Sequence, residues 1–309
     1  MKSLRKSLGF ICQSLLFSLV IVTMLCTTMT SQAETAEGAS KTTKSKANRT
    51  IAYGNNPSAG HRFEFNGAKI YYEVYGKGEP LLLLHGNGGS IEHFKNQIPY
   101  FAKHYRVIAM DSRGQGKSEL GGAKLTYELM MEDSNALLQH LNLKQVKVLG
   151  WSDGGILGLL LAIHYPDKVS RLAVMGANLV PEAAYPWALD GIKTTVAKIT
   201  AMKQSGDRSQ DWDLQLQLLD LLGNQPHIPV SDLKRIQAPT LVMAGDRDVI
   251  RDEHTLQIFH GIPQSQLAIG NGVTHMWPWE KSQQFNSIIH DFFAKPFKMP
   301  DSKDLGWFD

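Results

Sequence analysis

The sequence Val148-Leu-Gly-Trp-Ser-Asp-Gly-Gly-Ile156 places one serine among three glycines at the end of an apolar run. The run at 146–149 is typical of a buried strand, and the apolar residues 156–163 predict a buried helix. The junction between them matches Gly-x-Ser-x-Gly, which in this context holds a nucleophilic serine in a sharp turn. The glycines leave room for the adjacent strand and helix, and the helix N-terminus favours an anion developing beside Ser152. Taken alone, the motif also fits a glycine-rich turn with an N-cap serine.

Short apolar runs separated by helical patterns extend on both sides of this junction. The runs lie at 80–84, 105–110, 146–149, 172–175 and 240–243, and the helical patterns at about 90–103, 126–142 and 153–165. Strands that alternate with helices predict a mostly parallel, twisted sheet with helices on both faces. Upstream, apolar and polar residues alternate around Asn66-Gly67, which predicts a β-hairpin over 63–75.

The N-terminal 33 of the 309 residues differ from the rest of the chain. They begin with Lys2, Arg5 and Lys6, continue with an apolar stretch and close on Ser31-Gln-Ala33. This pattern predicts a secretory signal peptide over residues 1–33. An uncleaved N-terminal membrane anchor is the alternative, because the apolar stretch is almost long enough to span a bilayer. With either one, we expect the body of the protein to be exported to the periplasm or secreted.

The remaining chain divides by composition. Residues 34–58 are polar and predict a flexible tether. We expect the α/β core in two parts, 59–177 and 233–296, followed by a C-terminal tail over 297–309. Residues 178–232 carry helical patterns without a strand, which predicts a helical cap over the carboxyl edge of the sheet. Extra packing helices with no role at a site are the alternative.

Charge and cysteine content exclude several classes of function. Residues 1–33 hold three basic residues and no acid, so the chain without them carries no net charge and nothing favours nucleic-acid binding. Both cysteines also lie in that segment, so no thiol nucleophile is expected after cleavage. Histidines and acids lack metal-site spacing, so we expect no metal and no cofactor. The expected partner is a small-molecule substrate, and the oligomeric state stays open.

A serine nucleophile requires a base, and the base requires an orienting acid. For this type of junction the chain order is serine, acid, histidine. The strand predicted at 240–243 runs into a turn that holds Asp246 and Asp248, and a later short strand leads to His275. Both positions follow strands, at the sheet edge where Ser152 is expected. The residues by themselves leave two alternatives for the acid.

From about residue 62 to 295 the chain resembles the α/β-hydrolase superfamily. Five pieces in the right order carry the resemblance: Leu83-Leu-His-Gly-Asn-Gly-Gly89, Asp111-Ser-Arg-Gly-Gln-Gly-Lys-Ser118, Gly150-Trp-Ser-Asp-Gly-Gly155, Gly245-Asp-Arg-Asp248 and Val273-Thr-His275. The third piece, with Met175-Gly-Ala-Asn178, is also locally similar to valacyclovir-hydrolase-like esterases. The resemblance implies an α/β-hydrolase fold with a helical cap insertion.

The resemblance also implies a catalytic triad. Ser152 is the implied nucleophile, His275 the base, and Asp248 the acid that orients the base. Asp248 is favoured over Asp246 because the superfamily places the acid three residues after Gly245.

The same resemblance implies an oxyanion hole made by the backbone N–H groups of Asn87 and Asp153. His85 is implied to be a structural residue beneath the Asn87 loop. We expect His93 and His104 to face solvent.

The Asp153 carboxylate requires a separate explanation, because a negative charge beside the oxyanion site opposes the anion that forms there. One interpretation is that it binds a substrate ammonium, as in an aminoacyl ester or amide, which the resemblance also implies. The other is an acid in the first helical turn with local hydrogen bonds. Trp151 is a second candidate substrate contact.

The sequence therefore predicts an exported serine hydrolase that cleaves a small carboxylic ester, with an aminoacyl ester or amide as the more specific form. The alternatives on the same triad are a carbon–carbon bond hydrolase and a cofactor-free haloperoxidase-like enzyme. A non-catalytic binding protein of this fold is the alternative from a different class.

Overall fold

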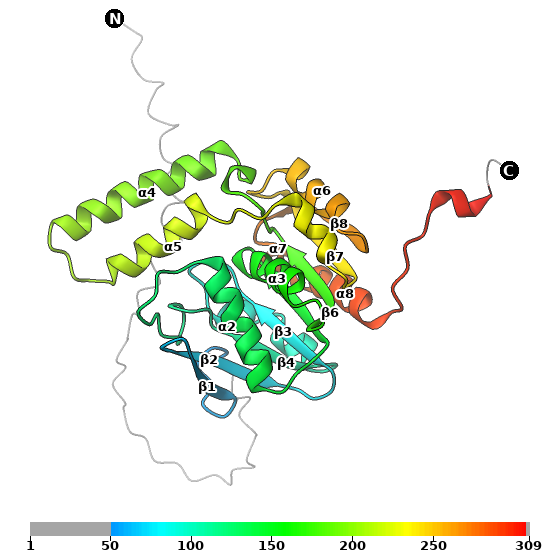
Figure 1. Cartoon of the computed structure of the whole chain (residues 1–309), viewed down its shortest axis with the longest axis horizontal. Coiled ribbons are helices and arrows are strands. Elements are labelled where there is room, and N and C mark those ends of the chain that lie inside the picture. Colours follow the sequence, from blue (N-terminus) through cyan, green and yellow to red (C-terminus); the bar gives the residue numbers. More distant parts are fainter. Residues whose placement is uncertain (1–50, 307–309) are drawn as a thin grey trace, which may run out of the picture. The chain divides into compact units, whose positions relative to one another are not determined.

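An eight-stranded sheet forms the centre of the protein (Figure 1). The computed structural model describes residues 51–306, and the predicted signal peptide lies outside these residues. The strand order is β1-β2-β4-β3-β5-β6-β7-β8. The strands are β1 (Gly60–Phe65), β2 (Ala68–Tyr75), β3 (Pro80–Leu84), β4 (Arg106–Met110), β5 (Val146–Trp151), β6 (Val169–Met175), β7 (Thr240–Arg247) and β8 (Ser265–Thr274).

The sheet is parallel except at one edge. β1 and β2 form the antiparallel hairpin predicted around Asn66-Gly67, and β2 runs antiparallel to β4. All other pairs are parallel. The central strands are apolar because both of their faces are covered; Leu81 to Leu84 of β3, for example, are fully buried. The predicted α/β-hydrolase fold class is confirmed.

Helices cover both faces of the sheet. One face packs against α2 (Tyr127–His140), α3 (Asp153–His164) and α6 (Asp252–Gly261), and the other against α1 (Ile98–Phe101), α7 (Trp277–Glu280) and α8 (Ser282–Ala294). Alternate residues of the central strands contribute to the two cores, as the two-residue period of a strand requires. The predicted helices near 126–142 and 153–165 therefore correspond to α2 and α3.

The single helix predicted at about 90–103 is wrong. The segment forms a short 3₁₀ helix, η1 (Ile91–Phe94), and then the short α1, which has Pro99 in its first turn. Proline has no backbone N–H and is tolerated only at the start of a helix, so it separates the two pieces. The apolar spacing that suggested one helix instead buries Phe94 and Phe101 from two separate turns.

The predicted tether, residues 34–58, ends earlier than expected within the described part of the chain. The Glu73 carboxylate is fully buried on β2. It accepts hydrogen bonds from the backbone N–H groups of Gly54 and Asn56, at 2.8 and 2.9 Å, and from two tyrosine hydroxyls. A buried carboxylate requires such donors. The polar composition of residues 52–58 therefore reflects a loop fastened to the sheet.

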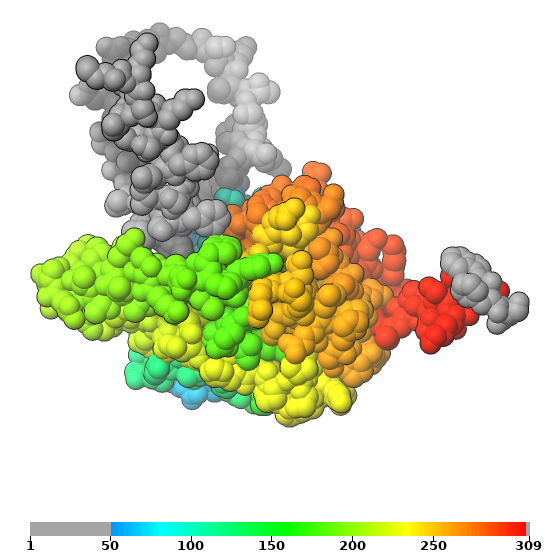
Figure 2. Space-filling view, turned by 90° about the horizontal axis from the view of Figure 1, so that it is seen from above, coloured from blue at the N-terminus to red at the C-terminus, as the bar shows by residue number. Residues whose placement is uncertain are grey.

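Two long helices, α4 (Pro186–Gln204) and α5 (Trp212–Asn224), occupy the interval predicted as a cap, together with the 3₁₀ helices η2 (Pro181–Ala183) and η3 (Val230–Arg235). α4 packs on α5 and lies at the surface (Figure 2), with Ile199 as its only buried residue. α5 buries Trp212, Leu218 and Leu221. Within residues 51–306, no helix combines the length and the apolar character needed to cross a bilayer.

Candidate active site

The junction between β5 and α3 holds Ser152 in a strained backbone conformation. Its φ is 57° and its ψ is −121°, a region that residues with a side chain rarely adopt. A Cβ on Gly150 would lie 2.0 Å from the Gly154 carbonyl oxygen, and a Cβ on Gly154 would lie 1.9 Å from the Leu84 carbonyl oxygen. The two motif glycines are therefore required by backbone contacts on either side of the serine.

The structure brings the three predicted triad residues together at the carboxyl ends of β5, β7 and β8. His275 Nε2 lies 2.8 Å from the Ser152 hydroxyl oxygen. His275 Nδ1 lies 2.6 Å from Asp248 Oδ1. Asp248 is held in turn by the backbone N–H groups of Gly245 and Ile250. This arrangement allows His275 to accept the serine proton while Asp248 fixes the orientation of the ring.

The charges around His275 suit a general base. Burial lowers its pKa, but the charge and hydrogen bond of Asp248 and the charge of Asp153 raise it, and the net pKa is above 6.5. For Asp248, burial raises the pKa, whereas His275 and the two backbone donors lower it, and the net pKa is below 3.8. The pair therefore favours the ionised acid beside a ring that can hold a proton.

These pKa directions predict the acid limb of the pH–rate profile. Neutral His275 is the base, so kcat/KM should fall as pH decreases through the His275 pKa, which lies above 6.5. Asp248→Asn should move this limb to lower pH, because burial then lowers the pKa without the acid to offset it. Asp153→Asn should move it in the same direction but less far. The measurement is kcat/KM against pH for one ester.

Asp246→Asn serves as the matched control for this series. Asp246 is partly exposed and accepts hydrogen bonds from the backbone N–H groups of Gly272 and Val273, so it holds a turn. This substitution should leave the acid limb in place. The assignment of His275 as the base and Asp248 as its partner would be contradicted by either of two results. One is a wild-type acid limb of kcat/KM below pH 6.5, and the other is an acid limb that does not move in Asp248→Asn.

The two backbone N–H groups implied as an oxyanion hole are free to donate. In residues 51–306 no hydrogen-bond acceptor pairs with the backbone N–H of Asn87 or of Asp153. Asp153 is the first residue of α3, where backbone N–H groups have no partner inside the helix. Free, directed N–H groups beside a nucleophile can stabilise a developing oxyanion.

His85 lies beneath the Asn87 loop, as the resemblance implied. It is buried, its Nε2 accepts a hydrogen bond from the backbone N–H of Ser112 at 3.0 Å, and its Nδ1 lies 2.8 Å from the Gly86 carbonyl oxygen. Burial lowers the pKa of His85 to about 4. A neutral ring with both nitrogens engaged fits a structural role.

Trp151 holds the backbone of His275 in place. Its side chain is buried, and its indole N–H donates a 2.8 Å hydrogen bond to the His275 carbonyl oxygen. The ring of His93 packs against Trp151 and Trp279 at centroid distances of 5.8 and 5.1 Å. The expectation that His93 faces solvent is therefore only partly correct, because its side chain is half-buried against these two rings. His104 is exposed, as expected.

The Asp153 carboxylate is buried and points toward the Asn87 side chain. Oδ2 accepts a 2.9 Å hydrogen bond from Asn87 Nδ2. Burial raises the pKa of Asp153 to about 6, although hydrogen bonds from Asn87 and Tyr127 and the charge of His275 oppose the increase. The carboxylate is thus mostly ionised at neutral pH. Its hydrogen bond to Asn87 reaches beyond its own helix to the loop after β3, the candidate oxyanion loop.

Sequence reasoning missed two residues that shape this site. Gly176 has a φ of 63°, and a Cβ there would lie 2.5 Å from the His275 ring, so the glycine makes room for the base. Tyr127 lies beside Asp153 although it begins helix α2. The Met175-Gly-Ala-Asn178 match was a signal for the first residue. No local pattern pointed to Tyr127.

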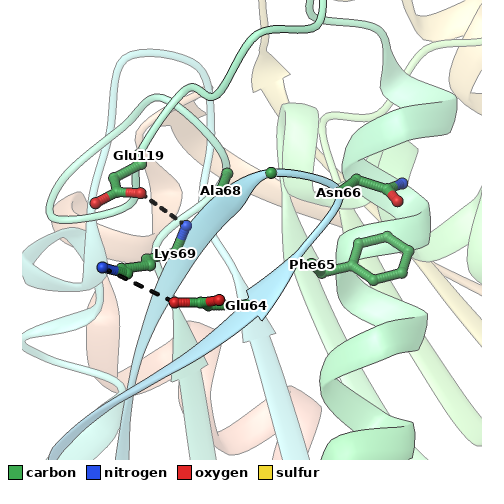
Figure 3. A pocket seen from close by; sticks show the side chains of 7 residues that line it. Glu64, Phe65, Asn66, Ala68, Lys69 and Glu119 are labelled. Atoms are coloured by element: carbon green, nitrogen blue, oxygen red, sulfur yellow. Dashed lines mark hydrogen bonds and ion pairs between the residues drawn. The ribbon is translucent and has the colours of Figure 1, made fainter.

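No cluster of three histidine, cysteine, aspartate or glutamate side chains in residues 51–306 has a geometry that could hold a metal ion. A hollow of about 320 Å³ lies at the β1–β2 turn (Figure 3). Three of the residues that line it are charged, and two of these, Lys69 and Glu64, pair at 3.8 Å. None of the triad residues lines this hollow.

Comparisons with known proteins agree with this geometry. Residues 79–226 match the model of a family described as having the alpha/beta hydrolase fold. A 2-hydroxy-6-oxononadienedioate/2-hydroxy-6-oxononatrienedioate hydrolase of Pseudomonas putida is 28% identical over 265 residues, covering 72% of this chain and 91% of that protein. The human serine hydrolase BPHL is 26% identical over 243 residues, covering 74% of this chain and 84% of that protein.

The crystal structure of a hydrolase from Pseudomonas aeruginosa superposes with a TM-score of 0.67 at 22% identity, covering 78% of this chain and all of that one. At 22% identity this likeness shows a common fold. Together with the family match and the named hydrolases among its relatives, it shows that the chain is an enzyme with the α/β-hydrolase fold.

Proposed function

We propose that this protein is a serine hydrolase that cleaves a small carboxylic ester through an acyl-enzyme on Ser152. The observation that carries the proposal is the hydrogen-bonded chain from the Ser152 hydroxyl through His275 to Asp248, at 2.8 and 2.6 Å. In this reaction the Ser152 oxygen bonds to the ester carbonyl carbon, and His275 takes the serine proton and delivers it to the leaving alcohol. Water then attacks the acyl-enzyme with His275 again as the base.

The charge distribution favours substrates whose acyl part is neutral or cationic. The buried Asp153 carboxylate lies next to the nucleophile. Two basic side chains are buried in residues 51–306: Arg113 is paired with Asp133, and Lys147 lies at the opposite end of β5 from Ser152. A carboxylate near the scissile bond would meet a like charge without a buried cation to offset it. An aminoacyl ester or amide is therefore the more specific form of the proposal.

Carbon–carbon bond hydrolysis is the second candidate. It is favoured by the likeness to relatives whose names describe hydrolases of dienoates and dienedioates. The same triad geometry serves that reaction, but the names of those substrates specify one or two carboxylates, which the charge around Asp153 disfavours.

A substrate panel separates these proposals. It should contain p-nitrophenyl esters of increasing chain length, aminoacyl esters and a 2-hydroxy-6-oxo-dienoate, with kcat/KM measured for each. We expect neutral and aminoacyl esters to be hydrolysed at least about tenfold more efficiently than the dienoate, a difference of roughly 1.4 kcal/mol in transition-state stabilisation. Preference for the dienoate would replace the ester proposal with the second candidate.

Asp153→Asn tests the aminoacyl form within the same panel. It should lower kcat/KM for aminoacyl esters more than for neutral esters of equal size. An equal decrease for both kinds of ester would remove the ammonium interpretation and leave the ester proposal intact.

We also propose that the protein is exported, on the basis of the basic start, apolar stretch and small residues of 1–33. Fractionation of cells that express the full chain, with N-terminal sequencing of the product, tests this. We expect a product that begins after Ala33 and lies outside the cytoplasm. An intact N-terminus in the membrane would support the anchor instead, and an intact chain in the cytoplasm would contradict export.

A further inference from the structure

The side-chain amide of Asn87 uses both of its hydrogens to join three segments of the chain. Nδ2 donates to Asp153 Oδ2 at 2.9 Å and to the Leu218 carbonyl oxygen at 3.0 Å. Asp153 begins α3, and Leu218 lies within α5. Asn87 itself lies in the loop after β3. A primary amide has two N–H donors, so both are engaged.

The first of these bonds connects the two residues of the candidate oxyanion hole. Their backbone N–H groups must point at one oxygen, although Asn87 and Asp153 are 66 positions apart in the chain. A side-chain hydrogen bond between the same two residues limits how far the loop after β3 can move from the start of α3. Misplacement of a stabilising donor by about 1 Å can reduce a rate about 100-fold.

The second bond connects this pair to helix α5. The Leu218 carbonyl lies inside the helix and has a second lone pair available for the Asn87 amide. Other polar contacts hold α5 against the segment before α2: Gln217 Oε1 accepts from the Leu125 backbone N–H at 2.9 Å, and Asp220 pairs with Lys124 at 2.9 Å. The Asn87 side chain thus links the position of α5 to the position of the oxyanion loop.

We propose that the Asn87 side chain is a positioning residue that sets the oxyanion hole by bonding Asp153, and that it fastens this pair to α5 through Leu218. The inference rests on the proposed serine hydrolase function. Asn87 acts through two separate groups: its backbone N–H faces the oxyanion, and its side-chain amide fixes where that N–H points. Because the same amide compensates the buried Asp153 charge, its loss also leaves that carboxylate short of a donor.

Four variants and a control test this role with a neutral p-nitrophenyl ester that the wild-type protein hydrolyses. Asn87→Ala and Asp153→Ala each remove the bond between the two residues. The double variant loses the same single bond, so its effect shows whether the two single variants act through one interaction. Asp153→Asn keeps an oxygen that can accept from the Asn87 amide. Gln217→Ala, on the same helix, removes a contact between α5 and the body of the protein without touching the oxyanion loop.

We expect Asn87→Ala to lower kcat about 10- to 100-fold with a small change in KM, since the lost interaction acts in the transition state. The double variant should be no slower than the slower single variant by more than about threefold, because the two singles break one shared interaction. Asp153→Asn should be at least about tenfold faster than Asp153→Ala. Gln217→Ala should stay within about threefold of wild type, which corresponds to a change of less than 1 kcal/mol.

Inhibitor binding distinguishes positioning of the oxyanion hole from a general loosening of the protein. A trifluoromethyl ketone forms an oxyanion on Ser152, whereas the matching methyl ketone reports ground-state binding. In Asn87→Ala, the Ki of the first should rise by the factor that kcat/KM loses, and the Ki of the second should not change.

Hydrogen exchange provides a readout that does not need activity. Asn87→Ala and Gln217→Ala should both increase exchange in residues 212–224, but only the first should slow hydrolysis. Unchanged kcat or unchanged exchange in Asn87→Ala would overturn the proposal, as would full additivity in the double variant or an equal loss of rate in Gln217→Ala. A wild-type protein that hydrolyses no ester would instead refute the proposed function, and exchange would still test the link to α5.

Discussion

Replacement of Ser152 by alanine should lower kcat for ester hydrolysis by about 10⁴- to 10⁶-fold, of the order seen when a member of a serine triad is removed. The alanine retains the backbone N–H groups at the site but offers no oxygen to the carbonyl carbon. His275, 2.8 Å from the missing hydroxyl, then has no proton to accept. The measurement is the rate of p-nitrophenol release, with residual activity recorded over hours.

The fold should survive this substitution. Ser152 and alanine differ by one oxygen, and both carry the Cβ that the positive φ already accommodates. The thermal midpoint should therefore stay close to that of wild type. Ser205→Ala, which changes an exposed serine at the end of α4, should leave kcat unchanged. A Ser152→Ala protein that retains more than about a hundredth of the wild-type kcat would point to a different nucleophile, since the activation free energy would then rise by less than half of the expected amount.

The second large effect is expected from Gly154→Ala. The added Cβ would lie 1.9 Å from the carbonyl oxygen of Leu84, so β3 and α3 cannot both keep their positions. Overpacking in a well-packed core typically costs 1–3 kcal/mol and here meets rigid backbone, so we expect a loss of about 3 kcal/mol or more in the free energy of unfolding. The displaced junction should also lower kcat at least about 100-fold.

Gly122→Ala is the matched control for this prediction. Gly122 has no atom within 4 Å of the position that a Cβ would occupy. Its substitution should change neither the free energy of unfolding nor kcat. Denaturant unfolding and ester hydrolysis, measured on both variants, check the pair. A Gly154→Ala protein as stable and as active as Gly122→Ala would show that the junction is less constrained than the contacts indicate.

Features encoded in short stretches of sequence could be predicted. The β5–α3 junction could be recognised because two glycines flank a serine between an apolar strand and an apolar helix. His275 and a turn with two candidate acids were found from their places after strands, since carboxyl ends of parallel strands meet at one edge of a sheet. The resemblance to the α/β-hydrolase superfamily then favoured Asp248 over Asp246. The structure places Asp248 and His275 beside Ser152.

Features that depend on distant contacts could not be predicted. Residues 52–58 were expected to be part of a tether because their composition is polar. The carboxylate that accepts hydrogen bonds from their backbone N–H groups belongs to Glu73, more than fifteen residues away in the chain. His93 was expected to face solvent because the two rings that pack against it, those of Trp151 and Trp279, are distant in the sequence. The Asn87 amide meets Leu218 across 131 positions, which no periodicity in the sequence specifies.

The central claim, that Ser152 forms a covalent acyl-enzyme, is tested most directly by intact-protein mass spectrometry after treatment with a fluorophosphonate. The reagent transfers its phosphonyl group to an activated serine and releases fluoride, as an ester transfers its acyl group. We predict one added phosphonyl group per folded chain, located on the peptide that contains Ser152, and no addition in Ser152→Ala. Folded protein that remains unlabelled, or a label on another residue, would contradict the claim.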